Sequence, residues 1–269
     1  MKRTVLQVAL EQFPQIEKKE LHAAILCGEL YADGGKVRNP KERIAEGAQL
    51  ELRRRRFVSR GGEKLSAAIA AWGVPVAGST WVDAGSSTGG FTDALLKAGA
   101  ARVYAVDVGR NQLAFSLRND ARVTALEETS LFDLRHLDPP ADYACCDLSF
   151  RSLAGAAAHL LDLTRRGRLI ALLKPQFELR YHGRGGGESF DGVLREPELL
   201  RRVLLETLRE LRDRDGAIPV RILESPVRGA KGNREFLLDL RRQERGMEGN
   251  VAVATVESLV ESLLSSGSG

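Results

Sequence analysis

WVDAGSSTGGFTD, residues 81–93, joins a short apolar run ending in Asp83 to a turn rich in glycine and serine, and then to an amphipathic segment. That order predicts a β-strand, a tight loop and the N-terminus of a helix. Gly85, Gly89 and Gly90 tolerate positive φ and carry no Cβ, so we expect the backbone to approach a ligand closely here. In doubly wound α/β domains, such a loop is where nucleotide-like ligands bind.

The spacing of this loop argues against two common ligands. A dinucleotide loop needs Gly-x-Gly-x-x-Gly, but Ser87 stands two residues after Gly85. A phosphate loop needs Lys and Ser or Thr after its last glycine, and Phe91 and Thr92 stand there instead. The loop therefore predicts a ligand that is neither NAD nor a polyphosphate.

Two carboxylates refine this prediction. Asp83 ends the first strand, and Asp107 lies in the next apolar run, 102–108, about 20 residues after the glycine turn, where a carboxylate accepts hydrogen bonds from a ribose diol. Two carboxylates repel phosphates but suit an ammonium, a sulfonium and ribose hydroxyls. We expect a nucleoside ligand; the alternative is a plain β-turn followed by a helix N-cap.

Six motifs between Val58 and Phe236 are similar to those of a known family. They are VSRGGEKL (58–65), VDAGSSTGGFTD (82–93), YAVDVGRNQLAFSLRND (104–120), CDLSF (146–150), LLKPQFE (172–178) and GNREF (232–236). In this order they resemble the TlyA family, also called hemolysin A, whose catalytic domain is of the FtsJ type. The resemblance implies an S-adenosylmethionine-dependent 2′-O-methyltransferase that acts on ribosomal RNA.

The order of elements predicts an α/β fold. Strands alternate with helical segments, which is typical of a mostly parallel sheet covered on both faces. With the resemblance, we expect a doubly wound, seven-stranded, Rossmann-like methyltransferase sheet whose last two strands form an antiparallel hairpin. After the second strand, we expect helices at 111–118, 153–163, 198–213 and 255–264, and strands at 122–127, 142–148, 168–174, 219–224 and 235–240.

The chain also predicts a small N-terminal α+β domain. Two short helices precede ELYADGGKVRNP, which reads as a hairpin with an Asp-Gly-Gly turn, and residues 48–52 predict a third strand. This order resembles the S4 RNA-binding fold, although Glu17-Lys18 stands where that family has Ser-Arg, and the bidentate phosphate contact of a guanidinium is lost. We expect an S4-like domain at 1–56, a linker at 57–62, a methyltransferase domain at 63–264 with a helix at 64–74 and a mobile loop at 183–192, and a disordered tail at 265–269.

Positive charge is concentrated at the N-terminus. Residues 1–60 hold 13 Lys and Arg against 8 Asp and Glu, whereas the whole chain carries +4, so the remainder is slightly acidic. This asymmetry predicts that the N-terminal segment meets a polyanion. The run 53–56 contains four arginines, for which a solvated surface is the alternative. The residues expected to contact RNA are Arg3, Lys18, Lys19, Arg38, Arg53, Arg54, Arg55, Arg56 and Arg60.

Cysteines and hydropathy limit the other partners. Cys27, Cys145 and Cys146 are an odd number, and neither they nor the histidines have metal-ligand spacing, so we expect no disulfide framework and no metal. The chain contains no apolar stretch of about 18 residues and no export signal. We therefore expect a cytoplasmic protein without a membrane partner.

Four charged residues match the Lys-Asp-Lys-Glu tetrad of the family in order: Lys64, Asp147, Lys174 and Glu235. They end or follow predicted strands or lie in the first core helix, although singly each has an ordinary reading as an exposed charge. The resemblance implies that Lys174 takes the proton of the 2′-hydroxyl, Asp147 and Glu235 orient it and balance charge, and Lys64 helps to hold the hydroxyl.

The cofactor set combines the glycine loop with the two strand ends. The residues expected to contact S-adenosylmethionine are Asp83, Gly85, Ser86, Ser87, Gly89, Gly90, Phe91, Asp107, Val108 and Asp147. Many amino methyltransferases carry Asn/Asp-Pro-Pro-Tyr/Phe where this chain has Asp147-Leu148-Ser149-Phe150. The missing prolines argue against methylation of a base nitrogen.

Two other functions compete with this interpretation. A membrane-active hemolysin needs an amphipathic or apolar segment long enough to insert, and none is seen. A non-catalytic RNA-binding or assembly factor would show a degraded loop or tetrad, and both are intact. One departure from the family remains: its Lys-Gly-Gly-Val-Val-Arg-Asp segment is FDGVLRE here, at 190–196.

Overall fold

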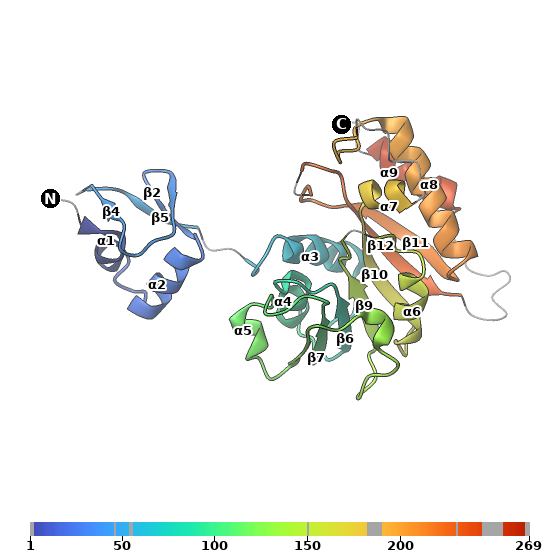
Figure 1. Ribbon diagram of the computed structural model, residues 1–269, viewed down its shortest axis with the longest axis horizontal. Helices are drawn as coiled ribbons and strands as arrows, with labels where there is room; N and C mark the ends of the chain where they lie inside the picture. The colour runs from blue at the N-terminus through green and yellow to red at the C-terminus, as the bar shows by residue number, and fades with distance from the viewer. Residues whose placement is uncertain are drawn as a thin grey trace. The chain divides into compact units, whose positions relative to one another are not determined.

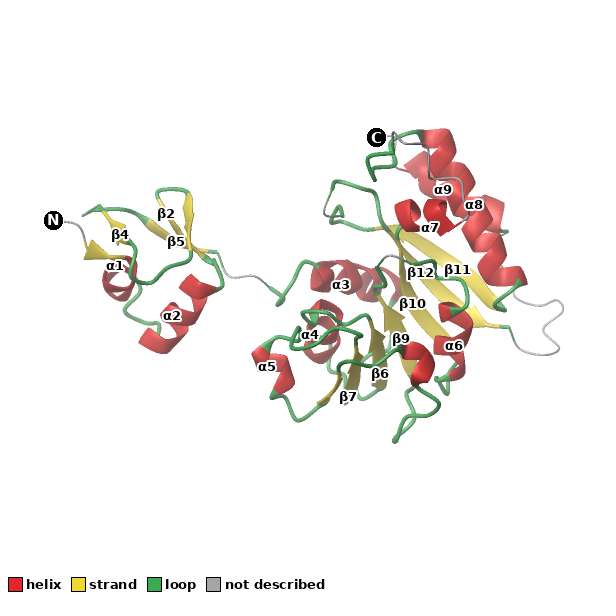
Figure 2. Ribbon diagram, viewed as in Figure 1, coloured by secondary structure: helices red, strands yellow, loops and turns green. Residues whose placement is uncertain are grey.

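The computed structural model describes residues 3–45, 47–53, 56–149, 151–181, 190–229, 231–243 and 255–266. The chain forms two compact units, Met1–Arg56 and Phe57–Gly269 (Figure 1). Figure 2 shows that each unit contains both helices and strands. Most of the loop expected at 183–192 and the last three residues of the expected tail lie outside the described residues.

The smaller unit packs two helices against short strands. Leu30–Ala32 and Gly35–Val37 form the predicted hairpin, and Asp33 and Gly34 at its turn have φ of 46° and 80°. Such turns need positive φ at both central residues, which explains the Asp-Gly pair. Val5, Ala9, Leu21, Ile25 and Leu30 are fully buried between the elements. The elements are α1 (Val5–Gln12), α2 (Lys18–Leu26), a sheet of order β3 (Gly35–Val37), β2 (Leu30–Ala32), β5 (Leu50–Leu52), and a pair formed by β1 (Arg3–Thr4) and β4 (Arg43–Ile44).

The larger unit is built on a seven-stranded sheet of order β11-β12-β10-β9-β6-β7-β8. The neighbours from β10 to β8 are parallel, whereas β12 is antiparallel to both β10 and β11. The predicted mostly parallel sheet and the antiparallel hairpin are confirmed. The strands are β6 (Thr80–Ala84), β7 (Arg102–Val106), β8 (Val123–Leu126), β9 (Tyr143–Cys146), β10 (Arg168–Leu173), β11 (Ala217–Glu224) and β12 (Phe236–Arg242).

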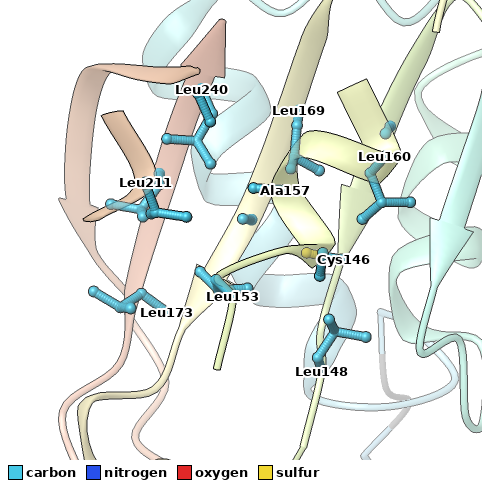
Figure 3. Close-up of a cluster of buried hydrophobic side chains, with 14 of the residues drawn as sticks. Cys146, Leu148, Leu153, Ala157, Leu160, Leu169, Leu173, Leu211 and Leu240 are labelled. Atoms are coloured by element: carbon cyan, nitrogen blue, oxygen red, sulfur yellow. The ribbon is translucent and has the colours of Figure 1, made fainter. Parts of the chain in front are cut away.

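Helices cover both faces of this sheet because its buried strands alternate their side chains between two apolar layers. Cys145 belongs to one layer and Cys146 to the other. The first layer packs against α3 (Gly61–Trp72), α4 (Gly90–Lys97) and α5 (Phe115–Arg118) (Figure 1). The second packs against α6 (Ala156–Asp162), α7 (Pro175–Tyr181), α8 (Pro197–Asp213) and α9 (Val256–Ser266). Figure 3 shows part of this second layer, with Cys146, Leu160, Leu169 and Leu240 among its side chains.

Two helices differ from the prediction. The helix expected at 111–118 begins only at Phe115, because Asn111 has a φ of 54° and the N–H groups of residues 111–113 donate to Glu127. Helix α7 was not predicted; Pro175 occupies its first position, where the missing N–H costs nothing. A short 3₁₀ turn, Leu131–Asp133, completes the described helical segments of this unit.

Candidate active site

The candidate residues gather at the edge of the sheet where the parallel strands end. Asp107 follows β7, Asp147 follows β9 and Lys174 follows β10. Glu235 precedes β12, which runs in the opposite direction, so it lies at the same edge. Ligands of open α/β sheets bind at this edge.

The register of the sheet explains why two distant residues meet here. Leu173 at the end of β10 pairs with Phe236 at the start of β12. Lys174 and Glu235 are the next residues outward on the two strands. An antiparallel β12 therefore places Glu235 beside Lys174, which a parallel strand would not do.

The four tetrad residues form two ion pairs. Lys64 Nζ lies 2.5 Å from Glu235 Oε2, and the two side chains are only 10% and 4% exposed. Lys174 Nζ lies 2.5 Å from Asp147 Oδ1 and donates a hydrogen bond of 3.0 Å to Ser149 Oγ. Because buried charges are stable only when they are paired, each pair fixes the position of its lysine.

Asp147 connects the tetrad to the glycine loop, residues 85–90. Its N–H donates to Ala84 O, and its carbonyl oxygen lies 2.6 Å from the place that a Cβ on Gly85 would take. Its Oδ1 has the distance of an ion pair to Lys174 but receives no hydrogen bond from the described residues. The side chain is held by charge and keeps acceptor capacity for a further donor.

Lys64, Lys174 and Glu235 line one cavity of about 400 Å³. A volume of this order is typical of small-ligand sites. Arg60, the residue that precedes α3, also lines it. The structure thus brings three of the four tetrad residues and one of the predicted RNA-contacting arginines to a single cavity, and Asp147 reaches it through its ion pair with Lys174.

The glycines of the loop are required by protein packing. A Cβ on Gly89 would lie 2.3 Å from Leu117 Cδ1, and one on Gly90 would lie 2.2 Å from Ser59 Oγ. Gly85 and Gly89 also have positive φ, 77° and 94°. Neighbouring protein atoms fill the space that the missing Cβ atoms leave, so these glycines are explained by packing within the protein. Their small size does not by itself make room for a ligand.

Asp107 holds the loop in place. Its Oδ2 accepts a hydrogen bond of 2.8 Å from Ser87 N, and its Oδ1 accepts one of 2.7 Å from Gly109 N. Ser87 has a φ of 47°, and its hydroxyl donates to Gln112 Oε1 at 3.2 Å. Each carboxylate oxygen has a second lone pair, so Asp107 retains acceptors for ribose hydroxyls.

The other residues that we expect to contact the cofactor differ in how exposed they are. Asp83 is fully buried; its carboxylate accepts from Thr92 Oγ1 at 2.7 Å, and burial raises its pKa to about 7. Phe91 and Ser86 are also buried, whereas Val108 is 75% exposed. Asp83 thus holds the first turn of α4 through Thr92, and Val108 is exposed to solvent.

Glu127 is a site residue that the sequence analysis missed. Its carboxylate accepts from the N–H groups of Asn111, Gln112 and Leu113, and Arg118 donates two bonds of 2.8 Å to it. The Arg118 hydrogen bonds, followed by the backbone donors, lower its pKa to about 2. Glu127 thus orders the segment that follows Asp107. The sequence contains one signal for this role: Glu127 comes directly after the third parallel strand, opposite the polar loop that follows Asp107.

The predicted RNA-contacting residues lie mostly in the smaller unit. Lys18, Lys19 and Arg38 are exposed there. Arg3 pairs with Glu11, and Arg53 pairs with Glu51 while its guanidinium stands 4.2 Å from the centre of the Tyr31 ring. Arg56 and Arg60 flank the boundary of the larger unit, and Arg54 and Arg55 lie outside the described residues.

In the part of the chain that the structure describes, no helix is long and apolar enough to cross a membrane. Over the same residues, no group of three or more His, Cys, Asp or Glu side chains is placed to hold a metal ion.

The chain matches known methyltransferases over most of its length. Residues 57–242 match the FtsJ-like methyltransferase family. The chain is 40% identical over 226 residues to the 16S/23S rRNA (cytidine-2′-O)-methyltransferase TlyA of Mycobacterium tuberculosis, covering 81% of each protein. It is 37% identical over 218 residues to Hemolysin A of Brachyspira hyodysenteriae, covering 79% of this chain and 89% of that protein.

One solved structure is similar to this chain over almost its whole length. It is a Streptococcus thermophilus protein named as a hemolysin, with 32% identity and a TM-score of 0.67, over 97% of this chain and 95% of that one. The chain belongs to the FtsJ-like methyltransferase family, in the group that contains TlyA and hemolysin A.

Proposed function

We propose that this protein transfers a methyl group from S-adenosylmethionine to the 2′-hydroxyl of a cytidine in ribosomal RNA. The observation that carries the proposal is the pair of ion pairs, Lys64–Glu235 and Lys174–Asp147, at one cavity beside the glycine loop. The name of the Mycobacterium tuberculosis relative supports cytidine as the nucleoside.

The residues at the strand ends fit the cofactor. Asp107 offers acceptors to ribose hydroxyls, and the N-terminus of α4 presents backbone N–H groups suited to a carboxylate. When bound, S-adenosylmethionine supplies an electrophilic methyl group on sulfur. The carbonyl of Asp147 lies beside Gly85 of the glycine loop, and its carboxylate contacts Lys174. The proposed cofactor site and the proposed base are therefore neighbours.

Lys174 is the proposed base for the 2′-hydroxyl. A hydroxyl attacks a methyl group effectively only when its proton is removed, and the oxygen must be in line with that group. The ammonium of Lys174 contacts two acceptors, Asp147 and Ser149, so it must give up a proton before it accepts one from ribose. Transfer of that proton along the Asp147 or Ser149 contact provides the route.

Lys64 and Glu235 have the positioning role. Their contact is almost wholly buried, so neither side chain turns toward solvent. The ammonium of Lys64 keeps two further N–H donors, which suit a ribose oxygen or a neighbouring phosphate oxygen. Glu235 balances the positive charge that two lysines bring to one cavity.

The smaller unit is the proposed RNA-binding domain, of S4-like type. Its two helices and short hairpin sheet carry exposed Lys18, Lys19 and Arg38, which suit phosphates. A protein that modifies ribosomal RNA works in the cytoplasm, which is the location we propose. A non-catalytic assembly factor is disfavoured, because all four tetrad residues are present and paired.

Mapping of 2′-O-methyl groups on ribosomal RNA tests the proposal. RNA from cells with the chain should carry at least one methylated ribose that is absent from cells without it, and a plasmid copy should restore it. A Lys174→Ala copy serves as the matched control and should not restore it. Identical maps with and without the chain would contradict the proposed function.

A further inference from the structure

Two cations with no part in the tetrad converge at the mouth of the active-site cavity. Arg180 lies near the end of α7, and Lys231 lies in the loop that leads to Glu235 and β12. Both line the cavity that holds Lys64 and Lys174. Both are exposed, so their heads are within reach of a large substrate.

Gly192 shows how close the two cations are. A Cβ on this residue would lie 3.4 Å from Lys231 Nζ and 4.0 Å from Arg180 Nη2. The two charged groups therefore both lie within 4.0 Å of one point beside Gly192. Like charges this close to one point repel each other, and an anion bound by both removes the repulsion.

The carboxylates near the two cations have other cationic partners. Glu235, which lines the cavity, pairs with Lys64. Asp191, next to the lining residue Gly192, pairs with Arg195 at 2.8 Å and is also attracted by Lys231. Within the described ranges, Lys231 Nζ donates one hydrogen bond, to the backbone oxygen of Asp191 at 3.2 Å, which leaves donors for a ligand. Among the described residues, the structure gives Arg180 no hydrogen-bonded or ion-paired partner.

The segment beneath the cations is fixed in position. Asn233 is buried; its Nδ2 donates to Gly192 O at 2.8 Å, and its Oδ1 accepts from Leu194 N at 2.9 Å. This double contact ties residues 192–194 to the loop that leads to Glu235 and β12. Of the cation pair, Arg180 and Lys231, Lys231 lies in this loop and is therefore held close to the tetrad.

A second observation favours a polar ligand in the cavity. Gln176 lines it and is only 8% exposed, yet its Oε1 is buried without a hydrogen-bond partner among the described residues. A buried amide oxygen left unpaired costs about 1–3 kcal/mol. A ligand with hydroxyl or amino donors as well as an anion satisfies both this oxygen and the cation pair.

We propose that Arg180 and Lys231 bind the phosphodiester on the 3′ side of the target ribose and so hold its 2′-hydroxyl at Lys174. The inference rests on the proposed function. In a ribonucleotide, the 3′-phosphate is attached to the carbon next to the one that carries the 2′-hydroxyl. This phosphate is the charged group nearest to the 2′-hydroxyl, so binding it at the mouth of the cavity fixes the position of the ribose. A guanidinium together with an ammonium suits a phosphate.

The test compares an Arg180→Gln/Lys231→Gln double variant with wild type, using unmodified ribosomal subunits and labelled S-adenosylmethionine. The matched control is Arg202→Gln, which removes an exposed arginine on α8 that does not line this cavity. We expect the double variant to raise KM for RNA about tenfold with kcat within about threefold. Its RNA affinity should also depend less on salt, by about 0.7 of slope for each lost contact to single-stranded RNA.

A substrate change tests the same contact without altering the protein. A short RNA that carries the mapped target and a neutral methylphosphonate at its 3′ linkage should lose about as much kcat/KM with wild type as the double variant loses with normal RNA. The double variant should not distinguish the two RNAs. Equal sensitivity of both proteins to the neutral linkage, or an unchanged KM and salt slope in the variant, would overturn the inference.

The outcomes separate this inference from the proposed function. If wild type methylates RNA and the variant behaves like Arg202→Gln, the phosphate contact alone is wrong. If wild type transfers no methyl group to any ribosomal RNA, the proposed function is wrong, and the salt slope of RNA binding still shows whether the two cations contact phosphates.

Discussion

Lys174 is held by Asp147 and Ser149 as an ammonium, and its proposed task is to accept a proton. Lys174→Ala should lower methyl transfer by about 10²-fold or more, because general-base catalysis contributes about that much. Lys174→Arg should be almost as inactive, since a guanidinium keeps the charge but does not shed its proton near neutral pH. Single-turnover rates with bound RNA measure both variants.

The arginine variant separates two roles for this position. If it restores most of the rate, Lys174 acts as a fixed positive charge, and the base must be sought among Lys64, Asp147 and Glu235. Cofactor and RNA affinities serve as controls, and both should stay nearly unchanged in the two variants.

Asp107 accepts hydrogen bonds from the loop and is proposed to accept them from the ligand as well. Its oxygens accept from Ser87 N and Gly109 N, and each keeps a second lone pair that a ribose hydroxyl can use. Asp107→Ala should weaken S-adenosylmethionine binding by about 1–3 kcal/mol, measured by calorimetry with and without RNA. Asp120→Ala, which removes an acid paired with Arg122 outside the loop, is the control and should have no effect. Unchanged affinity in Asp107→Ala would remove this residue from the site.

At the scale of elements, β12 shows where the sequence was informative and where it was not. Its apolar residues predict a strand, and the motif that includes Glu235 resembles the family. Its antiparallel direction entered only through that resemblance, because alternation of side chains is the same in either direction. The Lys174–Glu235 neighbourhood depends on this direction, so composition and spacing alone do not predict it.

Helices α5 and α7 show the limits of periodicity. Apolar residues near 111–118 fit a full helix, but hydrogen bonds from residues 111–113 to Glu127 replace its first turn. Helix α7 is short, from Pro175 to Tyr181. Packing against α8 stabilises it more than the helix propensity of its own residues does. Tertiary contacts of this kind have no local pattern in sequence.

Helix α7 also carries a buried acid that makes stability depend on pH. Glu178 is 1% exposed and accepts from Ser152 Oγ and Leu153 N, and burial raises its pKa from 4.5 to about 7. The folded state therefore binds the proton more tightly than the unfolded state, so the stability present at low pH falls as pH rises through this window. The shift corresponds to at most about 3 kcal/mol.

Glu178→Gln should remove the part of this loss of stability at high pH that Glu178 causes, because the neutral amide keeps an acceptor and never ionises. Denaturant unfolding at about pH 5 and about pH 8 measures the difference. Asp83 changes stability in the same direction and remains in both proteins, so the comparison isolates Glu178. A variant with the same pH dependence as wild type would show that Glu178 is not buried as an acid.

At the scale of the whole molecule, the division of labour between the two units is open to test. Replacing the four arginines at 53–56 by serine should weaken RNA binding for all sequences and flatten its salt dependence, by up to about 0.9 of slope per lost contact. Arg53 already pairs with Glu51 and stacks on Tyr31, so a phosphate has to compete with these contacts for its guanidinium. Filter binding across a salt series measures the slope. An unchanged slope would make the run a solvated linker.

Transfer of labelled methyl from S-adenosylmethionine to ribosomal subunits by the purified chain tests the central claim most directly. After digestion of the RNA to nucleosides, we predict that the label is found in 2′-O-methylcytidine, and that the Lys174→Ala protein gives at most about a hundredth of the rate. Label on a base, or none with intact wild type and bound cofactor, would contradict the account.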